Sequence, residues 1–169
     1  MNSTINQFTK RRNEIRPFRA GWSLLELIIV IVLMGILGSV GTMKFVDSLS
    51  YHRVNAAALR LSTDINAMQR QARVTAQTTS VQLGTPSNSY TLIGVQNPDR
   101  PALANPVVSL QDGVLKATFG TISLTGGGTT ITFNGYGIPN KGGTITLQSG
   151  SATKQVSVSG TSGIAEILP

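Results

Sequence analysis

The sequence predicts an α+β fold in which a long N-terminal helix packs on antiparallel β-sheet. An uncharged apolar run near the N-terminus continues, without proline, into a segment with helical periodicity. After Thr78 the composition changes to Gly, Thr, Ser and Val in short alternating runs, which is typical of antiparallel sheet. The 169 residues, 40% of them hydrophobic, suffice for one domain and an anchor. We expect a leader at 1–21, a transmembrane helix at 22–46, its amphipathic continuation at 47–78 and a β-rich domain at 79–169.

Residues 1–21 form a polar, basic leader in which Pro17 disfavours a continuous helix. Five basic residues stand against Glu14 alone, so this segment carries +4 of the chain's formal charge of +7, and residues 22–169 carry the remaining +3. The net charge is therefore only weak support for nucleic-acid binding. By the positive-inside rule, the basic residues of the leader place it on the cytoplasmic side of a membrane.

The uncharged run extends from Leu27 to Met43, which at 1.5 Å per helical residue reaches roughly 25 Å. With the apolar residues that flank it, a helix over 22–46 can cross a hydrocarbon core of about 30 Å. We therefore expect a single membrane pass surrounded by lipid. Gly35, Gly38 and Gly41 on this helix either permit close contact with a neighbouring helix or are merely tolerated in lipid.

Residues 47–78 show the periodicity of an amphipathic helix, with apolar positions at spacings of 3 and 4. We expect this apolar stripe to pack on the sheet domain while the charged residues, which lie outside it, face water. Together with the transmembrane part, a helix of up to about 56 residues, on the order of 80 Å, is expected. The stripe consists of Val54, Ala58, Leu61, Ile65, Met68 and Ala72, and the charged residues are Arg53, Arg60, Asp64, Arg70 and Arg73.

The C-terminal part alternates short β-type runs with turn residues, and we expect the segment Asn97 to Pro106, with its three prolines, to be a connecting loop. Strands are expected at Ser80 to Leu83, Tyr90 to Val95, Val107 to Leu110, Leu115 to Phe119, Thr130 to Phe133, Thr144 to Leu147, Gln155 to Val158 and Ile164 to Ile167. Turns with positive φ are expected at Gly126 to Gly128, Asn134-Gly135, Asn140 to Gly143 and Ser149-Gly150.

The segment Ala20-Gly21-Trp22-Ser23-Leu24-Leu25-Glu26 joins the leader to the apolar run. The basic stretch ends in Gly21, one aromatic residue follows, and a lone carboxylate stands at the fifth position after the glycine. This pattern resembles the class III signal of type IV prepilins and pseudopilins. The resemblance implies that a prepilin peptidase cuts after Gly21 and then N-methylates the new N-terminus at Trp22. Glycine suits the cleaved bond because it leaves an extended backbone unobstructed, whereas Trp22 stands where the family usually has Phe.

Glu26 is a carboxylate just inside the apolar run, where its insertion costs up to about 2.5 to 3.5 kcal/mol at the membrane centre and less near the edge. The resemblance implies that Glu26 pairs with the freed amine of Trp22 on a neighbouring subunit during assembly. Two alternatives remain. Glu26 sits in the headgroup region of an ordinary signal anchor, or the run is a secretory signal cleaved near Gly38 or Gly41.

The C-terminal half carries a softer resemblance. Ile131 to Pro139, followed by Gly142 to Leu147, looks like the paired strands of the H-type minor pseudopilin (GspH/FimT-like) family, and Gln155 to Gly163 fits the same pattern. The resemblance implies a type IV pilin-like fold anchored in the bacterial inner membrane with a periplasmic domain. The implied partners are the prepilin peptidase, other pilin-like subunits and an inner-membrane assembly platform.

Catalysis is not predicted, and no metal or cofactor is expected. The chain lacks cysteine, its sole histidine, His52, is isolated, and the sheet-domain carboxylates are scattered. DNA binding is also disfavoured, because DNA-binding relatives carry a Gly-Arg-x-Arg motif where this chain has Gly163-Ile164-Ala165-Glu166. We therefore favour a minor pseudopilin of a type II secretion system. A minor pilin of a type IV pilus is the second hypothesis, and a DNA-binding minor pilin in natural transformation is the third.

Overall fold

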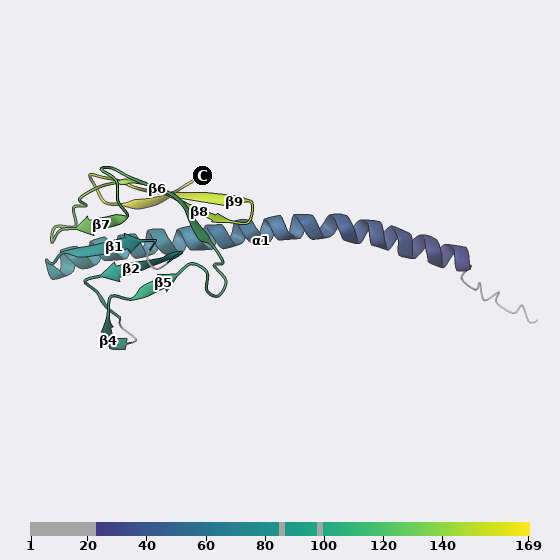
Figure 1. Cartoon of the computed structure of the whole chain (residues 1–169), viewed down its shortest axis with the longest axis horizontal. Coiled ribbons are helices and arrows are strands. Elements are labelled where there is room, and N and C mark those ends of the chain that lie inside the picture. Colours follow the sequence, from purple (N-terminus) through teal and green to yellow (C-terminus); the bar gives the residue numbers. More distant parts are fainter. Residues whose placement is uncertain (1–22, 85–86, 98–99) are drawn as a thin grey trace, which may run out of the picture. The chain divides into compact units, whose positions relative to one another are not determined.

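The computed structural model describes residues 23–84, 87–97 and 100–169. Within these ranges it contains the long helix α1 (Leu24–Thr75) and ten strands (Figure 1). The chain divides into two units, residues 1–40 and residues 41–169, and α1 contributes its first part to one and its remaining part to the other.

The ends of α1 are set by local hydrogen bonds and backbone geometry. At the N-terminus, Ser23 Oγ accepts a hydrogen bond from the Leu25 amide at 3.2 Å, as an N-cap residue does. At the C-terminus, Ala76 adopts a positive φ of 52°, which ends the helix after Thr75. The predicted continuous helix is therefore present, but its expected extension to residue 78 is too long by three residues.

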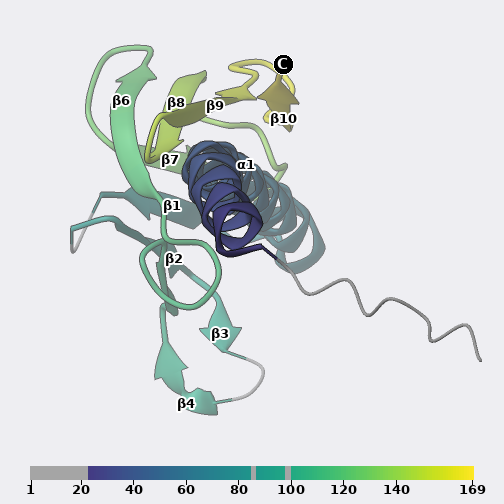
Figure 2. The ribbon, with the colours of Figure 1, turned by 90° about the vertical axis from the view of Figure 1, so that its right-hand side faces the viewer.

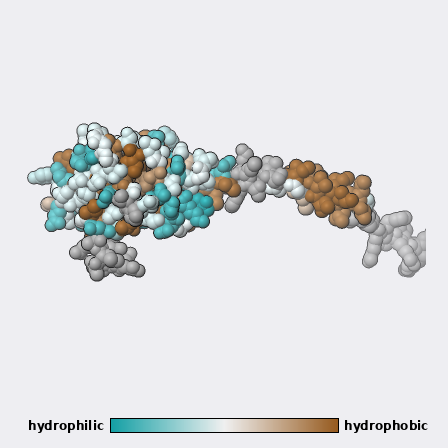
Figure 3. Space-filling model, viewed as in Figure 1, coloured by the Kyte–Doolittle hydropathy of each residue, from teal (hydrophilic) through white to brown (hydrophobic). Residues whose placement is uncertain are grey.

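The first part of α1 exposes its apolar side chains. The large hydrophobic residues exposed between Leu24 and Leu37 have 48% to 75% of their surface accessible, and they colour this part of the helix brown in Figure 3. In the part of the chain that the structure describes, no helix has the length and hydropathy needed to cross a membrane. The transmembrane helix at 22–46 stays a prediction.

The second part of α1 carries the core face that the periodicity predicts. All six residues of the expected stripe are buried, with exposed fractions of 2% or less. One polar prediction is wrong: the Asp64 side chain is only 13% exposed, because it lies against the sheet rather than in water. The buried stripe is formed by Val54, Ala58, Leu61, Ile65, Met68 and Ala72, and Ala57 adds to it.

The strands form two four-stranded antiparallel sheets, in the orders β5-β2-β1-β7 and β10-β9-β8-β6, and a small sheet of β3 and β4. Figure 2 shows β8, β9 and β10 over one side of α1 and β1 and β2 over another. The strands are β1 (Thr79–Leu83), β2 (Ser89–Ile93), β3 (Gln96–Asn97), β4 (Arg100–Ala104), β5 (Val107–Ser109), β6 (Thr118–Leu124), β7 (Thr130–Phe133), β8 (Gly143–Ser149), β9 (Ala152–Val158) and β10 (Ala165–Leu168).

One hydrophobic core joins the helix to both four-stranded sheets. The first sheet contributes side chains from β1, β2 and β7, and the second contributes side chains from β6, β8, β9 and β10. Because α1 supplies one continuous apolar face to both, the two sheets share the helix as their common packing surface. The buried strand residues are Val81, Leu83, Tyr90, Leu124, Ile131, Phe133, Ile145, Leu147, Val156, Val158 and Ala165.

Two sequence predictions about strands and one about a turn are wrong. The expected loop Asn97 to Pro106 contains β4 and the end of β3. The strand expected at Leu115 to Phe119 begins at Thr118 and extends to Leu124. The positive φ expected at Asn134-Gly135 occurs at Gly137 instead.

The two strands that resembled a pair, β7 and β8, belong to different sheets. The physical reason is that the loop after β7 folds back on that strand's free edge. Phe133 forms an antiparallel bridge with Pro139, and the Asn140 amide donates to the Thr132 carbonyl oxygen at 2.8 Å. With this edge occupied, β8 pairs with β6 and β9.

Candidate assembly site

The three residues predicted for processing and assembly lie at the start of the chain. Gly21 and Trp22 lie outside the described residues. Glu26 lies in the first turn of α1 and is exposed. The structure thus shows only the carboxylate of the expected site.

Glu26 also occupies a capping position that the sequence analysis missed. Ser23 is the N-cap, so Glu26 stands at the third helical position, in the Ser-x-x-Glu spacing of a capping box. A carboxylate here is favoured by the helix dipole, by about 0.3 to 1 kcal/mol. The Ser23 to Glu26 spacing was the signal that could have revealed this second role.

The surroundings of Glu26 are apolar and unpacked. Leu25 and Leu27 beside it are 68% and 54% exposed. A Cβ atom added at Gly35 or Gly38 would meet no heavy atom within 4 Å, apart from the nearby helix backbone. A carboxylate in such an apolar surface can pair with a cationic group from outside the chain, and the glycines leave room for a close neighbouring helix.

A hydrogen-bonded triad links α1 to the first sheet. The hydroxyl of the fully buried Tyr90 donates to Asp64 Oδ2 at 2.5 Å, and Arg60 Nε donates to the same oxygen at 2.9 Å. Burial of the ring and the hydrogen bond to Asp64 raise the pKa of Tyr90 above its usual value of 10.0. The hydrogen bond and charge of Asp64 likewise raise the pKa of Arg60 above its usual value. The phenol is thereby held in its protonated form.

Two amide side chains of α1 hold the C-terminal part of the chain. Asn66 accepts from the Ala165 amide at 2.9 Å and donates to the Ala165 carbonyl oxygen at 3.0 Å, so it pairs with β10 as a neighbouring strand would. The buried Gln69 donates to the carbonyl oxygens of Gly137 and Ser162. Both amides bind backbone groups of distant residues. A pattern of side chains in the sequence therefore could not predict these contacts.

The loop 134–140 closes over the C-terminal end of α1. Asn134 Oδ1 accepts hydrogen bonds from the amides of Tyr136 and Ile138, both at 3.0 Å. Arg73 Nε lies 3.3 Å from the Tyr136 carbonyl oxygen, and a Cβ at Gly137 would overlap the Arg73 side chain. Glycine is favoured there by its φ of 71°, and a larger residue would also displace the Arg73 side chain.

The comparisons with known proteins agree with this geometry. A family model described as "Type II transport protein GspH" matches residues 57–162, which include most of the buried part of α1 and nine strands. The chain belongs to the GspH family. The GspH-family chain is also similar to a solved structure of the type IV minor pilin FimU from Pseudomonas aeruginosa. The likeness has 14% identity and a TM-score of 0.51, and covers 70% of this chain and 90% of that one. No curated protein matches the sequence.

The α+β class and the type IV pilin-like fold are therefore confirmed, and with them the expected GspH/FimT-like family. A GspH-family protein of this fold is a pilin-like structural subunit and not an enzyme. Such a subunit associates with other pilin subunits.

The residues weighed for catalysis are not gathered into one site. His52 is exposed and meets the Tyr51 ring edge-on, with 5.9 Å between ring centroids. Among the described residues, no group of three or more His, Asp and Glu side chains could hold a metal ion. A surface hollow of about 250 Å³ beside the loop 134–140 is lined by neutral side chains, namely Thr78, Thr132, Asn134, Ile138, Pro139 and Asn140.

The segment considered for DNA binding, Gly163 to Glu166, packs against α1 in this GspH-family chain. Gly163 has a φ of 75°, and a Cβ there would lie 2.5 Å from Gln69 Nε2. Ala165 is buried against Asn66, and Glu166 is exposed. The segment thus presents a carboxylate where binding to phosphate requires a cation.

Proposed function

We propose that this chain is a minor pseudopilin of a type II protein secretion system and that it joins the pseudopilus through its N-terminal helix. The observation that carries the proposal is the match of residues 57–162 to the family of the type II transport protein GspH. The leader motif supports it independently, because Gly21, Trp22 and Glu26 lie outside the matched residues. The proposed location is the bacterial inner membrane, with a single pass over 22–46 and a periplasmic C-terminal domain.

The proposed assembly reaction begins with the leader. A prepilin peptidase cuts the peptide bond after Gly21 and methylates the amine that the cut creates on Trp22. Glu26 of one subunit then pairs with the Trp22 amine of its neighbour, which offsets the cost of placing a carboxylate in lipid. An inner-membrane assembly platform adds the subunit to the filament. The exposed carboxylate in its apolar surroundings supports this pairing.

The cleavage step is tested by co-expressing the full chain with a prepilin peptidase and determining the mature N-terminus by mass spectrometry. The expected N-terminus is Trp22, and Gly21→Ala should leave the chain unprocessed. Unchanged processing of that variant, or a cut near Gly41, would contradict the proposed leader.

The pairing step needs a control for the capping position of Glu26. Glu26→Ala removes both the charge and the capping group, whereas Glu26→Gln removes the charge and keeps a side chain that can cap the helix. Both variants should be processed and inserted but should fail to enter the filament. If only the alanine variant fails, Glu26 serves the helix terminus and not subunit pairing.

The choice of apparatus is tested by co-purification of the full chain with pseudopilus components or with type IV pili. Recovery with pseudopilus components is expected, and recovery with pili alone would assign the chain to the second apparatus. A mobility shift with double-stranded DNA at near-physiological salt should be absent. A shift that disappears in a variant of the basic residues would restore the transformation hypothesis.

A further inference from the structure

The helix segment just after the predicted membrane pass remains partly uncovered by the sheets. Val46, Leu49 and Tyr51 are 58%, 36% and 50% exposed, although the first residue of the buried stripe, Val54, is fully buried. His52 is exposed as well. An apolar and aromatic surface therefore precedes the point at which α1 enters the core.

The turn between β8 and β9 is bound to this segment. Ser151 Oγ donates to Asp47 Oδ1 at 3.1 Å, and the Cβ position of Gly150 lies 2.7 Å from Ser50 Oγ. The ammonium group of Lys154 stands 5.7 Å from the centroid of the Tyr51 ring, within reach of a cation–π interaction. We call the residues at this level of the molecule the turn–helix surface, which consists of Val46, Leu49, Tyr51 and Arg53 of α1 and Lys154 of β9. Tyr51, beside Lys154, and Arg53 lie on different sides of α1, because residues two positions apart do not share a helix face.

The composition of the turn–helix surface is that of a membrane interface. Arg53 and Lys154 are cationic, and Asp47, on the same segment of α1, accepts a hydrogen bond from Ser151. Tyrosine is enriched at the headgroup level of membranes, and long basic side chains extend toward lipid phosphates from apolar stems. Exposed aliphatic side chains next to cations indicate a partner that is apolar and anionic together, which describes an anionic phospholipid surface.

The spacing along α1 agrees with this partner. From Val46, where the predicted membrane pass ends, Tyr51 is about 7 Å and Arg53 about 10 Å further along a helix that rises 1.5 Å per residue. The headgroup region adds roughly 5 to 8 Å on each side of the hydrocarbon core. Tyr51 therefore stands at the outer edge of the headgroups, and the long side chains of Arg53 and Lys154 can reach them.

We propose that the turn–helix surface binds the headgroups of anionic phospholipids and seats the sheet domain on the membrane before the subunit enters a filament. The inference rests on the proposed membrane pass. The contact holds the domain through charge and the Tyr51 ring, so the domain can leave the membrane when subunit contacts replace the lipid.

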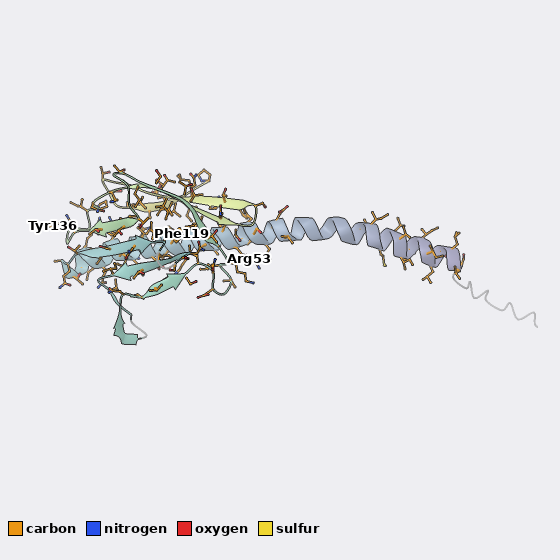
Figure 4. All side chains as sticks on the ribbon, in the orientation of Figure 1. Arg53, Phe119 and Tyr136 are labelled. Atoms are coloured by element: carbon orange, nitrogen blue, oxygen red, sulfur yellow. The ribbon has the colours of Figure 1, made fainter. Side chains whose placement is uncertain are left out.

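The test uses the full chain reconstituted in vesicles of phosphatidylcholine, with or without phosphatidylglycerol. Because the chain has no cysteine, Ser151→Cys carries a single spin label at the turn. Tyr136→Cys is the control position, since Tyr136 is 81% exposed and lies at the end of the unit away from Arg53 (Figure 4). Collision with oxygen and with a water-soluble nickel chelate then reports whether each label is in lipid or water.

The expected result is a severalfold higher ratio of oxygen to nickel collisions at position 151 than at position 136, increasing further with phosphatidylglycerol. Removing the two cations by Arg53→Gln and Lys154→Gln should abolish the increase. Arg70→Gln with Lys141→Gln removes the same charge away from the β8–β9 turn and should leave the increase intact. If the chain resists carbonate extraction, it is inserted in the membrane. Equal ratios at positions 151 and 136 in such a chain would overturn the headgroup contact and leave the membrane pass intact. Extraction of the chain by carbonate would refute the membrane pass and, with it, this contact.

Discussion

The bond between Tyr90 and Asp64 allows a sharp test of how the helix holds the first sheet. Tyr90→Phe keeps the ring, which is fully buried, and removes only the hydroxyl that donates to Asp64. Asp64 retains Arg60 at 2.9 Å, so the carboxylate is not left without a partner. The substitution therefore isolates a single charge-assisted hydrogen bond.

A hydrogen bond to a charged group contributes about 1.5 to 3 kcal/mol to the free energy of unfolding. We expect Tyr90→Phe to lower the free energy of unfolding by about 1.5 to 3 kcal/mol at neutral pH. The Asp64 side chain is only 13% exposed, so water screens its hydrogen bond less than that of a surface group. The expected loss of stability is therefore larger than for an exposed ion pair.

The effect should also depend on alkaline pH, because the folded state raises the pKa of Tyr90 above its usual value of 10.0. A raised pKa means that the folded chain keeps its proton more tightly than the unfolded chain. The stabilisation is therefore complete below about pH 10 and is lost as the pH rises beyond it, at about 1.4 kcal/mol per pH unit. The difference between the native chain and Tyr90→Phe should accordingly narrow by about 1 kcal/mol between pH 10 and 11, because only half of the unfolded tyrosine is ionised at pH 10 and the full slope is reached above it.

The assay is urea unfolding of the full chain in detergent, followed by circular dichroism between pH 7 and 11. Tyr136→Phe is the matched control, because Tyr136 is 81% exposed and the same atom is removed. It should change stability by less than about 0.5 kcal/mol. A stability difference for Tyr90→Phe that is absent, or that stays constant through pH 11, would refute the role assigned to this bond.

Three further substitutions test the packing of the helix and sheets in the same unfolding assay. Asn66→Ala leaves both backbone groups of Ala165 without their partner and should cost about 1 to 3 kcal/mol; no loss would mean that β10 is held without it. Leu61→Ala should cost about 2 to 5 kcal/mol because Leu61 is fully buried, whereas Leu59→Ala, at a 57% exposed position, should be nearly neutral; similar losses would contradict the assigned core face. Gly143→Ala should destabilise by at least about 2 kcal/mol, since its Cβ would lie 2.1 Å from a carbonyl oxygen of β6, and a stable variant would show that the two strands can separate there.

The helix and its buried face could be predicted because their signal is local. An amphipathic helix repeats its pattern every few residues, so the stripe from Val54 to Ala72 is visible without any knowledge of the sheets. The strand at Gln155 to Val158 is likewise visible from its alternation, and it lies within β9. Local periodicity fixes which face of an element is buried, and in these elements it did so correctly.

The pairing of strands could not be predicted, because it depends on which edges remain free. The sequence from Ile131 to Leu147 reads as two strands joined by a Gly-rich turn, yet the loop between them occupies the edge of β7 and sends β8 to the other sheet. Asp64 is missed for a related reason. Its position outside the stripe predicts exposure, and only the partner strand, with the Tyr90 hydroxyl, places it against the sheet.

One part of the candidate assembly site could be predicted from the sequence, and another part could not. Glu26 could be found because a lone carboxylate in an apolar run is costly and therefore conspicuous. Its place in the spacing of a capping box follows from Ser23, which is recognised as the N-cap only once the start of the helix is known. The turn–helix surface had no sequence signal, since Tyr51 and Lys154 are far apart in the chain and meet only through the turn between β8 and β9.

The polar positions of α1 explain how one helix can organise both sheets. Apolar contacts alone fix the depth of packing but not the register, because they are nondirectional. Asp64 adds a directional contact to β2 through Tyr90, and Asn66 adds one to β10 through Ala165, which follows 99 residues later. Because each buried amide or carboxylate is costly without its partner, a shifted strand would leave these groups unsatisfied. The helix that is proposed to assemble the filament therefore also sets the register of the domain that it carries.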